Sequence, residues 1–125
     1  MGGMLAYLYI FIGGGLGAVS RYGIGRLSEN FLGNQFPFGT LLSNFLSCLV
    51  LGLLLYYAVG LKWFSQEMKL LIFVGFCGGF STFSTFSIET VQLFKSGQNI
   101  EGILNIAISL ALCFSTLLLL SKQKL

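Results

Sequence analysis

The chain lacks histidine and aspartate, and its only acidic residues are four glutamates: Glu29, Glu67, Glu89 and Glu101. The chain therefore has few side chains that could transfer protons in acid–base catalysis or bind a transition metal. Only 9% of the residues are charged and 55% are hydrophobic, whereas a soluble domain has roughly 25% charged residues. The composition therefore predicts an integral membrane protein surrounded by lipid, not an enzyme, and with no nucleic acid partner.

Proline and cysteine are also scarce. Pro37 is the single proline among 17 glycines, a balance typical of membrane helices that approach one another closely, because small residues drive helix association in lipid. The three cysteines, Cys48, Cys77 and Cys113, lie inside apolar segments and form no CxxC pair. An odd number without that spacing predicts neither a disulfide framework nor a zinc site. We interpret the cysteines as small packing residues.

Four apolar segments are long enough to cross a bilayer, which takes about 20 mainly apolar residues. They cover residues 4–26, 38–61, 68–94 and 100–120, and the charged and turn-forming residues fall between them. The sequence therefore predicts one all-α membrane domain over residues 1–125, with four transmembrane helices joined by short loops.

Positive charge near the span ends, which sets the orientation of a membrane protein, is almost evenly divided. With four spans, one side carries Lys62, Lys69, Lys122 and Lys124, and the other carries Arg21, Arg26 and Lys95. A bias this weak predicts insertion in both orientations and an antiparallel, dual-topology homodimer with its two-fold axis in the membrane plane. The alternative is that Arg21 lies inside its span and does not count, which strengthens the bias.

The third apolar segment contains glycines and hydroxyls where lipid-facing backbone calls for plain hydrocarbon. Residues 75–87 read GFCGGFSTFSTFS, with Gly78 and Gly79 near the middle of the span. Non-helical backbone at membrane depth occurs only where it is buried in protein or lines a cavity. We therefore expect the helix to break at this pair. Carbonyls freed there suit a hard cation such as Na⁺, and freed amides suit an anion.

Phe83 and Phe86 follow on one face of the same segment. Aromatic edges carry the positive end of the ring quadrupole and can solvate a small anion, although an aromatic stripe at this spacing is ordinarily core. Glu89 lies three residues further on, and an acidic residue at this depth is either functional or paired. Its candidate partners are Arg21 and hydroxyls of another helix.

The other spans carry polar stripes. Thr40, Ser43, Asn44 and Ser47 share one side of the second span, where Asn44 either offers amide donors to an anion or makes a packing hydrogen bond. Asn105, Ser109 and Cys113 step by four along the fourth span, with Thr116 beside them. Such a stripe either forms a track for a small ion or merely bonds carbonyls one turn back. In the first span, Arg21 lies at the end of the helix face that carries the glycines. It either anchors the helix or places a positive charge at the mouth of an anion path.

Three motifs together resemble the Fluc/CrcB family of fluoride channels across nearly the whole chain. They are GGGLGAVSRY at residues 13–22, FPFGTLLSN at 36–44 and GFCGGFSTFSTFSIE at 75–89, and the last is highly specific. The resemblance implies small four-helix subunits paired antiparallel in a bacterial inner membrane, with two pores per dimer. It also implies a structural Na⁺ on the two-fold axis, held here by the carbonyls of Gly78 and Ser81.

The same resemblance implies a role for individual residues. Phe83 and Phe86 match the pore-lining phenylalanines, Asn44 the second-helix asparagine, and Arg21 the arginine near the vestibule. Polar positions of the fluoride pathway are matched by Thr40, Ser84, Glu89 and Ser109, and the pathway continues to Cys113 or to Thr116. Under this interpretation fluoride enters cells as neutral HF, is trapped as the ion, and leaves passively through the channel.

Two other classes of protein remain open from the residues alone. Small multidrug exporters are also four-span and dual-topology, but they depend on a glutamate in the first span. This chain has none there, so Glu89 would have to carry the protons. The second alternative is a packing subunit of a larger complex that transports nothing.

Overall fold

The computed structural model describes residues 2–122, and within that range the chain is helical and contains no strand. Its elements are α1 (Gly3–Leu32), α2 (Phe38–Tyr57), α3 (Gln66–Lys69), the π-helical η1 (Leu70–Cys77), α4 (Gly78–Phe80), α5 (Phe83–Lys95) and α6 (Asn99–Lys122). Four stretches, at residues 3–32, 38–57, 66–95 and 99–122, are long and apolar enough to cross a membrane. The prediction of an all-helical protein with four spans is confirmed.

Two helix ends differ from the sequence prediction by four residues or more. α1 continues past Arg26 to Leu32, because the polar residues that follow Arg26 stay helical until Gly33. Gly33 ends the helix with φ 78°, a left-handed conformation that favours glycine, and its N–H donates to the Glu29 carbonyl at 3.0 Å. α2 ends earlier than predicted, at Tyr57. Lys124, one of the charges used to weigh the orientation, lies outside the described residues.

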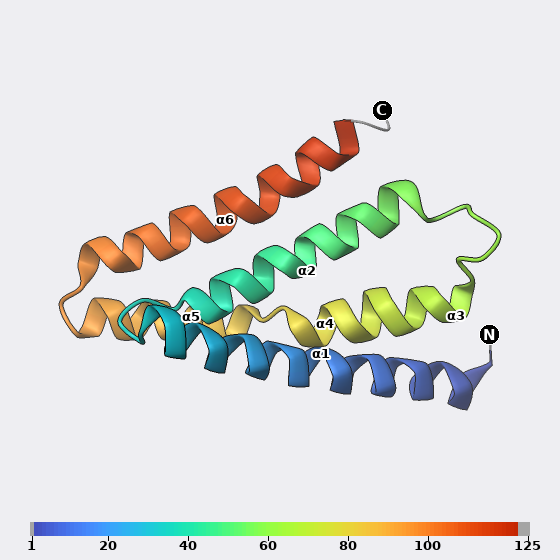
Figure 1. The fold of residues 1–125 in the computed structure, drawn as a ribbon, viewed down its shortest axis with the longest axis horizontal. Coiled ribbons are helices and arrows are strands. Elements are labelled where there is room, and N and C mark those ends of the chain that lie inside the picture. Colours follow the sequence, from blue (N-terminus) through green and yellow to red (C-terminus); the bar gives the residue numbers. More distant parts are fainter. Residues whose placement is uncertain (1, 123–125) are drawn as a thin grey trace.

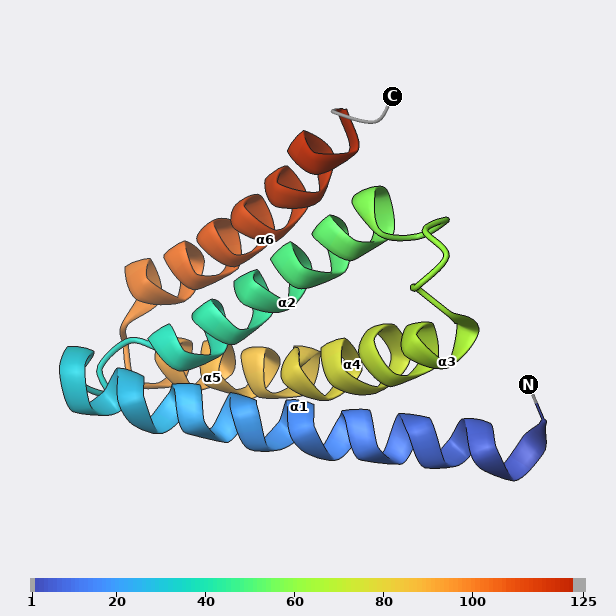
Figure 2. The same ribbon diagram turned by 45° about the vertical axis from the view of Figure 1, so that its right-hand side comes forward.

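The helices form two pairs (Figure 1). α2 and α6 lie side by side and run in the same direction, and α1 lies along η1 and α4. A second view shows that the α2–α6 pair splays away from α1 and η1 toward the C-terminal ends of α2 and α6 (Figure 2). The two pairs therefore meet most closely near the start of α2, where α4 gives way to α5.

Glycines bring α1 into backbone contact with the third span. A Cβ at Gly17 would lie 2.8 Å from the Phe80 nitrogen and would also collide with the Phe76 carbonyl. On the facing helix, a Cβ at Gly75 would lie 2.9 Å from the Gly13 Cα. These contacts are with backbone atoms, which cannot move aside as a side chain can, so both helices need glycine along this seam.

The third span changes its backbone conformation at Ser81 and Thr82. The helix that begins at Gln66 continues through η1 and α4 to Phe80, after which Ser81 (φ −85°, ψ 157°) and Thr82 (φ −155°, ψ 121°) are extended. The sequence-based prediction placed the change at Gly78 and Gly79, but both are helical. Gly79 has no side chain because α1 lies against it, where a Cβ would collide with backbone atoms. The hydroxyl of Thr82 caps α5 by accepting from the Thr85 N–H at 3.1 Å.

Most of each span faces outward. Only 11% to 22% of the residues in the apolar windows of the four spans are buried within the described chain. Large apolar side chains such as Phe11, Leu16 and Phe114 are exposed on this outer surface. Lipid or further protein must cover a surface of this kind, because water does not.

Candidate ion pathway

Asn44 on α2 holds the extended segment through both atoms of its amide. Its Oδ1 accepts from the Thr82 N–H at 2.7 Å, and its Nδ2 donates to the Thr82 carbonyl at 3.2 Å. Because a backbone N–H can only donate and a carbonyl can only accept, these partners fix the orientation of the amide. Asn44 therefore has the packing role that the sequence left open, and one amide N–H remains for a ligand.

Two more side chains satisfy the backbone beside the extended segment. Arg21 Nε donates to the Gly79 carbonyl at 3.1 Å, so this arginine anchors α1 to the end of α4. Ser47 Oγ donates to the Cys77 carbonyl at 3.1 Å, one turn earlier in the third span. We did not single out Ser47 as a site residue, although its position on the polar stripe of α2 was the available signal.

The Gly78 and Ser81 carbonyls lose their helical partners at this point. In a continuous helix Gly78 O would accept from Thr82 N–H, which here donates to Asn44 instead. Ser81 O would accept from Thr85 N–H, which here donates to the Thr82 hydroxyl. Gly78 is exposed, and a Cβ placed on it would meet no atom within 4 Å. The two oxygens are therefore freed from helical hydrogen bonding beside an open surface.

A cavity of about 210 Å³ opens between α2, α5 and α6. The side chains around it combine donors, thiols and aromatic rings: Asn44, Cys48, Ser81, Thr82, Phe83, Phe86, Ser109, Leu110 and Cys113. The two phenylalanine rings are 5.7 Å apart between centroids, but Phe86 is 9% exposed and Phe83 is 76% exposed. Phe86 thus belongs to the interior wall, and Phe83 lies at the outer edge of the same cavity.

A buried hydrogen-bonded chain connects α6 to Phe86. Ser109 Oγ donates to Asn105 Oδ1 at 3.4 Å, Asn105 Nδ2 donates to Thr90 Oγ1 at 2.9 Å, and Thr90 Oγ1 donates to the Phe86 carbonyl at 2.7 Å. Asn105 is only 2% exposed. It therefore positions α5 against α6, and Thr90, which our sequence analysis missed, is the partner that makes this possible.

The two candidates for continuing the α6 track occupy different surroundings. Cys113 lines the cavity one turn beyond Ser109. Thr116 is not among the lining residues, and its hydroxyl donates to the Leu112 carbonyl at 2.6 Å on its own helix. Ser84 also lies outside this cavity, within hydrogen-bond distance of the Thr82 hydroxyl at 3.3 Å. The structure therefore brings Cys113, and not Thr116 or Ser84, together with Asn44 and Phe86.

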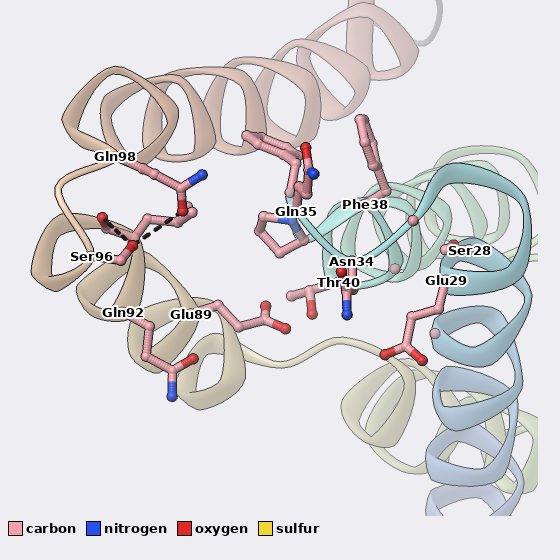
Figure 3. A pocket seen from close by; sticks show the side chains of 16 residues that line it. Ser28, Glu29, Asn34, Gln35, Phe38, Thr40, Glu89, Gln92, Ser96 and Gln98 are labelled. Atoms are coloured by element: carbon pink, nitrogen blue, oxygen red, sulfur yellow. Dashed lines mark hydrogen bonds between the residues drawn. The ribbon is translucent and has the colours of Figure 1, made fainter.

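Glu89 lies in a second, polar cavity of about 390 Å³ at the end of the bundle where α1, α2 and α5 meet. Glu89 from α5 and Glu29 from α1 point into it from opposite sides, with Thr40 and Asn34 between them (Figure 3). Thr40 lies beside the Glu89 carboxylate, whose buried Oε1 has no hydrogen-bond partner among the described residues. Arg21 is engaged with Gly79, so of the two predicted types of partner it is a hydroxyl, that of Thr40, that lies beside Glu89.

The spans and the two cavities between them define a multi-pass membrane protein whose interior carries groups suited to a small ion. A family model for the CrcB-like protein, Camphor Resistance (CrcB), matches residues 8–120, and the chain belongs to this family. The match reaches into all four spans.

Curated relatives extend the comparison. A protein of Dehalococcoides mccartyi strain BAV1, named a fluoride-specific ion channel, is 46% identical over 79% of this chain and 76% of its own. Proteins with the same name in Coxiella burnetii (strain Dugway 5J108-111) and Shewanella woodyi are 41% and 44% identical, each over at least 85% of both chains.

Proposed function

We propose that this protein is a fluoride-selective channel, and not an enzyme, through which fluoride leaves the cell passively. The observation that carries the proposal is the cavity bounded by Asn44, Ser109 and Phe86, where an amide, a hydroxyl and an aromatic ring converge between α2, α5 and α6. Membership of the family and the names of the relatives support fluoride as the ion.

The cavity offers uncharged groups that can replace the water molecules around a small anion. Ser109 can turn its hydroxyl toward an ion, and Asn44 keeps one amide N–H after bonding Thr82. The edge of the Phe86 ring adds positive potential without a formal charge. Selection against chloride then follows from a narrow lining that fits the smaller ion and replaces its tightly held water.

The direction of transport follows from the chemistry of the ion. Fluoride crosses membranes as neutral HF and dissociates in a less acidic cytoplasm, where the ion is trapped. A passive pathway lets it leave down its electrochemical gradient, which limits its toxicity without coupling to an energy source. The polar cavity at Glu89 and Thr40 then acts as a vestibule at one end of the route.

The functional unit we propose is an antiparallel homodimer in a bacterial inner membrane, with the third helix broken at mid-depth. The exposed ring of Phe83 and the open surface at Gly78 support a second copy against this face. The nearly even charge distribution supports insertion in both orientations. In such a dimer each pathway is completed by the partner.

Na⁺ is the cofactor we propose for the dimer axis. The Gly78 and Ser81 carbonyls fit this ion, because their helical partners are diverted and hard cations prefer oxygen ligands. Two carbonyls from each copy would hold the ion, and its positive charge would offset the negative ends of the converging carbonyl dipoles. Protein dialysed into Na⁺-free buffer and assayed by atomic emission should retain about one Na⁺ per dimer; none retained would overturn a tightly held structural ion.

The central test is fluoride release from liposomes that contain the purified protein, followed by a fluoride electrode beside a chloride electrode. Fast fluoride release without chloride release is expected. Phe83→Ile and Phe86→Ile should abolish it, whereas Phe114→Ile, on the exposed face of α6, should not. A chain that inserts correctly but releases no fluoride under an adequate gradient would refute the channel.

A further inference from the structure

Two thiols from neighbouring helices line the cavity of the candidate pathway. Cys48 on α2 and Cys113 on α6 are both free cysteines, both line the cavity, and their side chains lie close enough to interact. Neither residue is fully buried. The packing role expected from the sequence therefore does not describe them completely, because they form a pair of sulfur ligands beside an open space.

The register of α2 against α6 makes this pairing a property of the fold. The two helices run in the same direction, so steps of four residues keep facing positions together. Asn44 and Ser109 line the cavity at one level, and Cys48 and Cys113 follow one turn later. One further turn on, a Cβ at Gly52 would lie 3.1 Å from a Leu117 methyl group. The helices are thus held together on the far side of the thiols.

The ligand set selects the kind of ion. Among the described residues no group of three or more His, Cys, Asp or Glu side chains surrounds a common point, so a four-coordinate zinc site is excluded there. Two sulfurs suffice for soft ions that accept linear two-coordination, and thiolates favour such ions over hard ones. Binding of a monovalent ion breaks one S–H bond and releases that proton to water. One thiolate, one thiol and one M⁺ then form a neutral complex, which suits a low-dielectric interior.

We propose that Cys48 and Cys113 form a two-sulfur site for a soft monovalent metal ion, Ag⁺ or Cu⁺, and that the bound ion obstructs the pathway. The binding site stands on the two thiols alone, whereas the obstruction rests on the proposed function. Cys77 does not belong to the site, because its sulfur donates to the Ser47 carbonyl at 3.9 Å. It provides a matched control within the same chain.

Ag⁺ binding to the purified protein in chloride-free detergent buffer tests the site directly. Metal analysis after desalting should find one Ag⁺ per chain in the wild type and in Cys77→Ser. Cys48→Ser and Cys113→Ser should each weaken binding at least 100-fold, and X-ray absorption of the wild-type complex should show two sulfur neighbours. Equal Ag⁺ retention in the Cys48→Ser protein, or a single sulfur neighbour, would overturn the two-sulfur site.

Fluoride release in the presence of Ag⁺ nitrate tests the obstruction. Wild type and Cys77→Ser should lose at least 90% of their release rate, and the Cys48→Ser and Cys113→Ser proteins should keep theirs. Release that continues with Ag⁺ bound at the two sulfurs would overturn the obstruction and leave the site standing. If no variant releases fluoride even without Ag⁺, the proposed function fails, and the metal site is decided by the binding and absorption measurements.

Discussion

Replacing Asn44 with alanine should loosen the extended segment of the third span. The substitution removes two hydrogen bonds at once, one at 2.7 Å from the Thr82 N–H and one at 3.2 Å to the Thr82 carbonyl. A hydrogen bond between membrane helices contributes about 0.6 kcal/mol on average and at most about 1.7 kcal/mol. The loss of both should therefore cost between about 1 and about 3.5 kcal/mol.

Amide hydrogen exchange of Thr82, measured by mass spectrometry or NMR in detergent, reports this loss at the bond itself. Since about 1.4 kcal/mol corresponds to a factor of ten, exchange at Thr82 should be between about 5 and about 300 times faster in Asn44→Ala. Amides of α6 serve as an internal reference, and Asn34→Ala, in an exposed loop, serves as the control variant. Unchanged protection at Thr82 would refute the assignment of Asn44 as its partner.

Three further predictions concern the helix contacts and the polar anchors. Gly17→Ala should destabilise the protein by about 1–3 kcal/mol, because its Cβ meets backbone atoms. Gly15→Ala, whose Cβ meets no atom within 4 Å, should change the stability by no more than about 0.5 kcal/mol. Denaturant titration compares the two variants, and equal effects would contradict a tight seam. Asn105→Leu should slow fluoride release and cost about 1 kcal/mol, since it breaks the link between α6 and α5; an unaltered rate and stability would show that this link positions nothing. Arg21→Gln should lower thermal stability more than Arg26→Gln, because Arg21 alone of the two is bonded to Gly79, and the reverse order in a melting experiment would count against that anchor.

The spans were predictable because lipid imposes one requirement on every residue of a segment. Hydropathy alone located four helices, and the glycines and hydroxyls of residues 75–87 marked the segment where regular structure ends. The position of the change was missed by a few residues. Glycine pairs suggest weak helix, but Gly79 is needed for contact with α1, and the side-chain cap of Thr82 decides where α5 begins.

The site was less predictable because its contacts join distant parts of the chain. Asn44 and Thr82 are 38 residues apart, and no local pattern indicates which backbone group an amide will meet. Phe83 and Phe86 share a helix face by spacing, yet of the two only Phe86 is buried, which depends on how α5 packs against the other helices. The choice between Cys113 and Thr116 likewise depended on the rotation of α6.

The hydrogen bonds around the extended segment can form in a definite order as the chain is synthesised. Arg21, Asn44 and Ser47, the side chains from other helices that satisfy Gly79, Thr82 and Cys77, all precede the third span in the sequence. During synthesis these three side chains have already emerged from the ribosome when the third span enters the membrane, so their partners at Gly79, Thr82 and Cys77 can be bonded on arrival. A later hydrogen bond, from Asn105 to Thr90, can close only when α6 follows. The backbone groups at Gly79, Thr82 and Cys77 therefore have their partners in the membrane before α6 is synthesised.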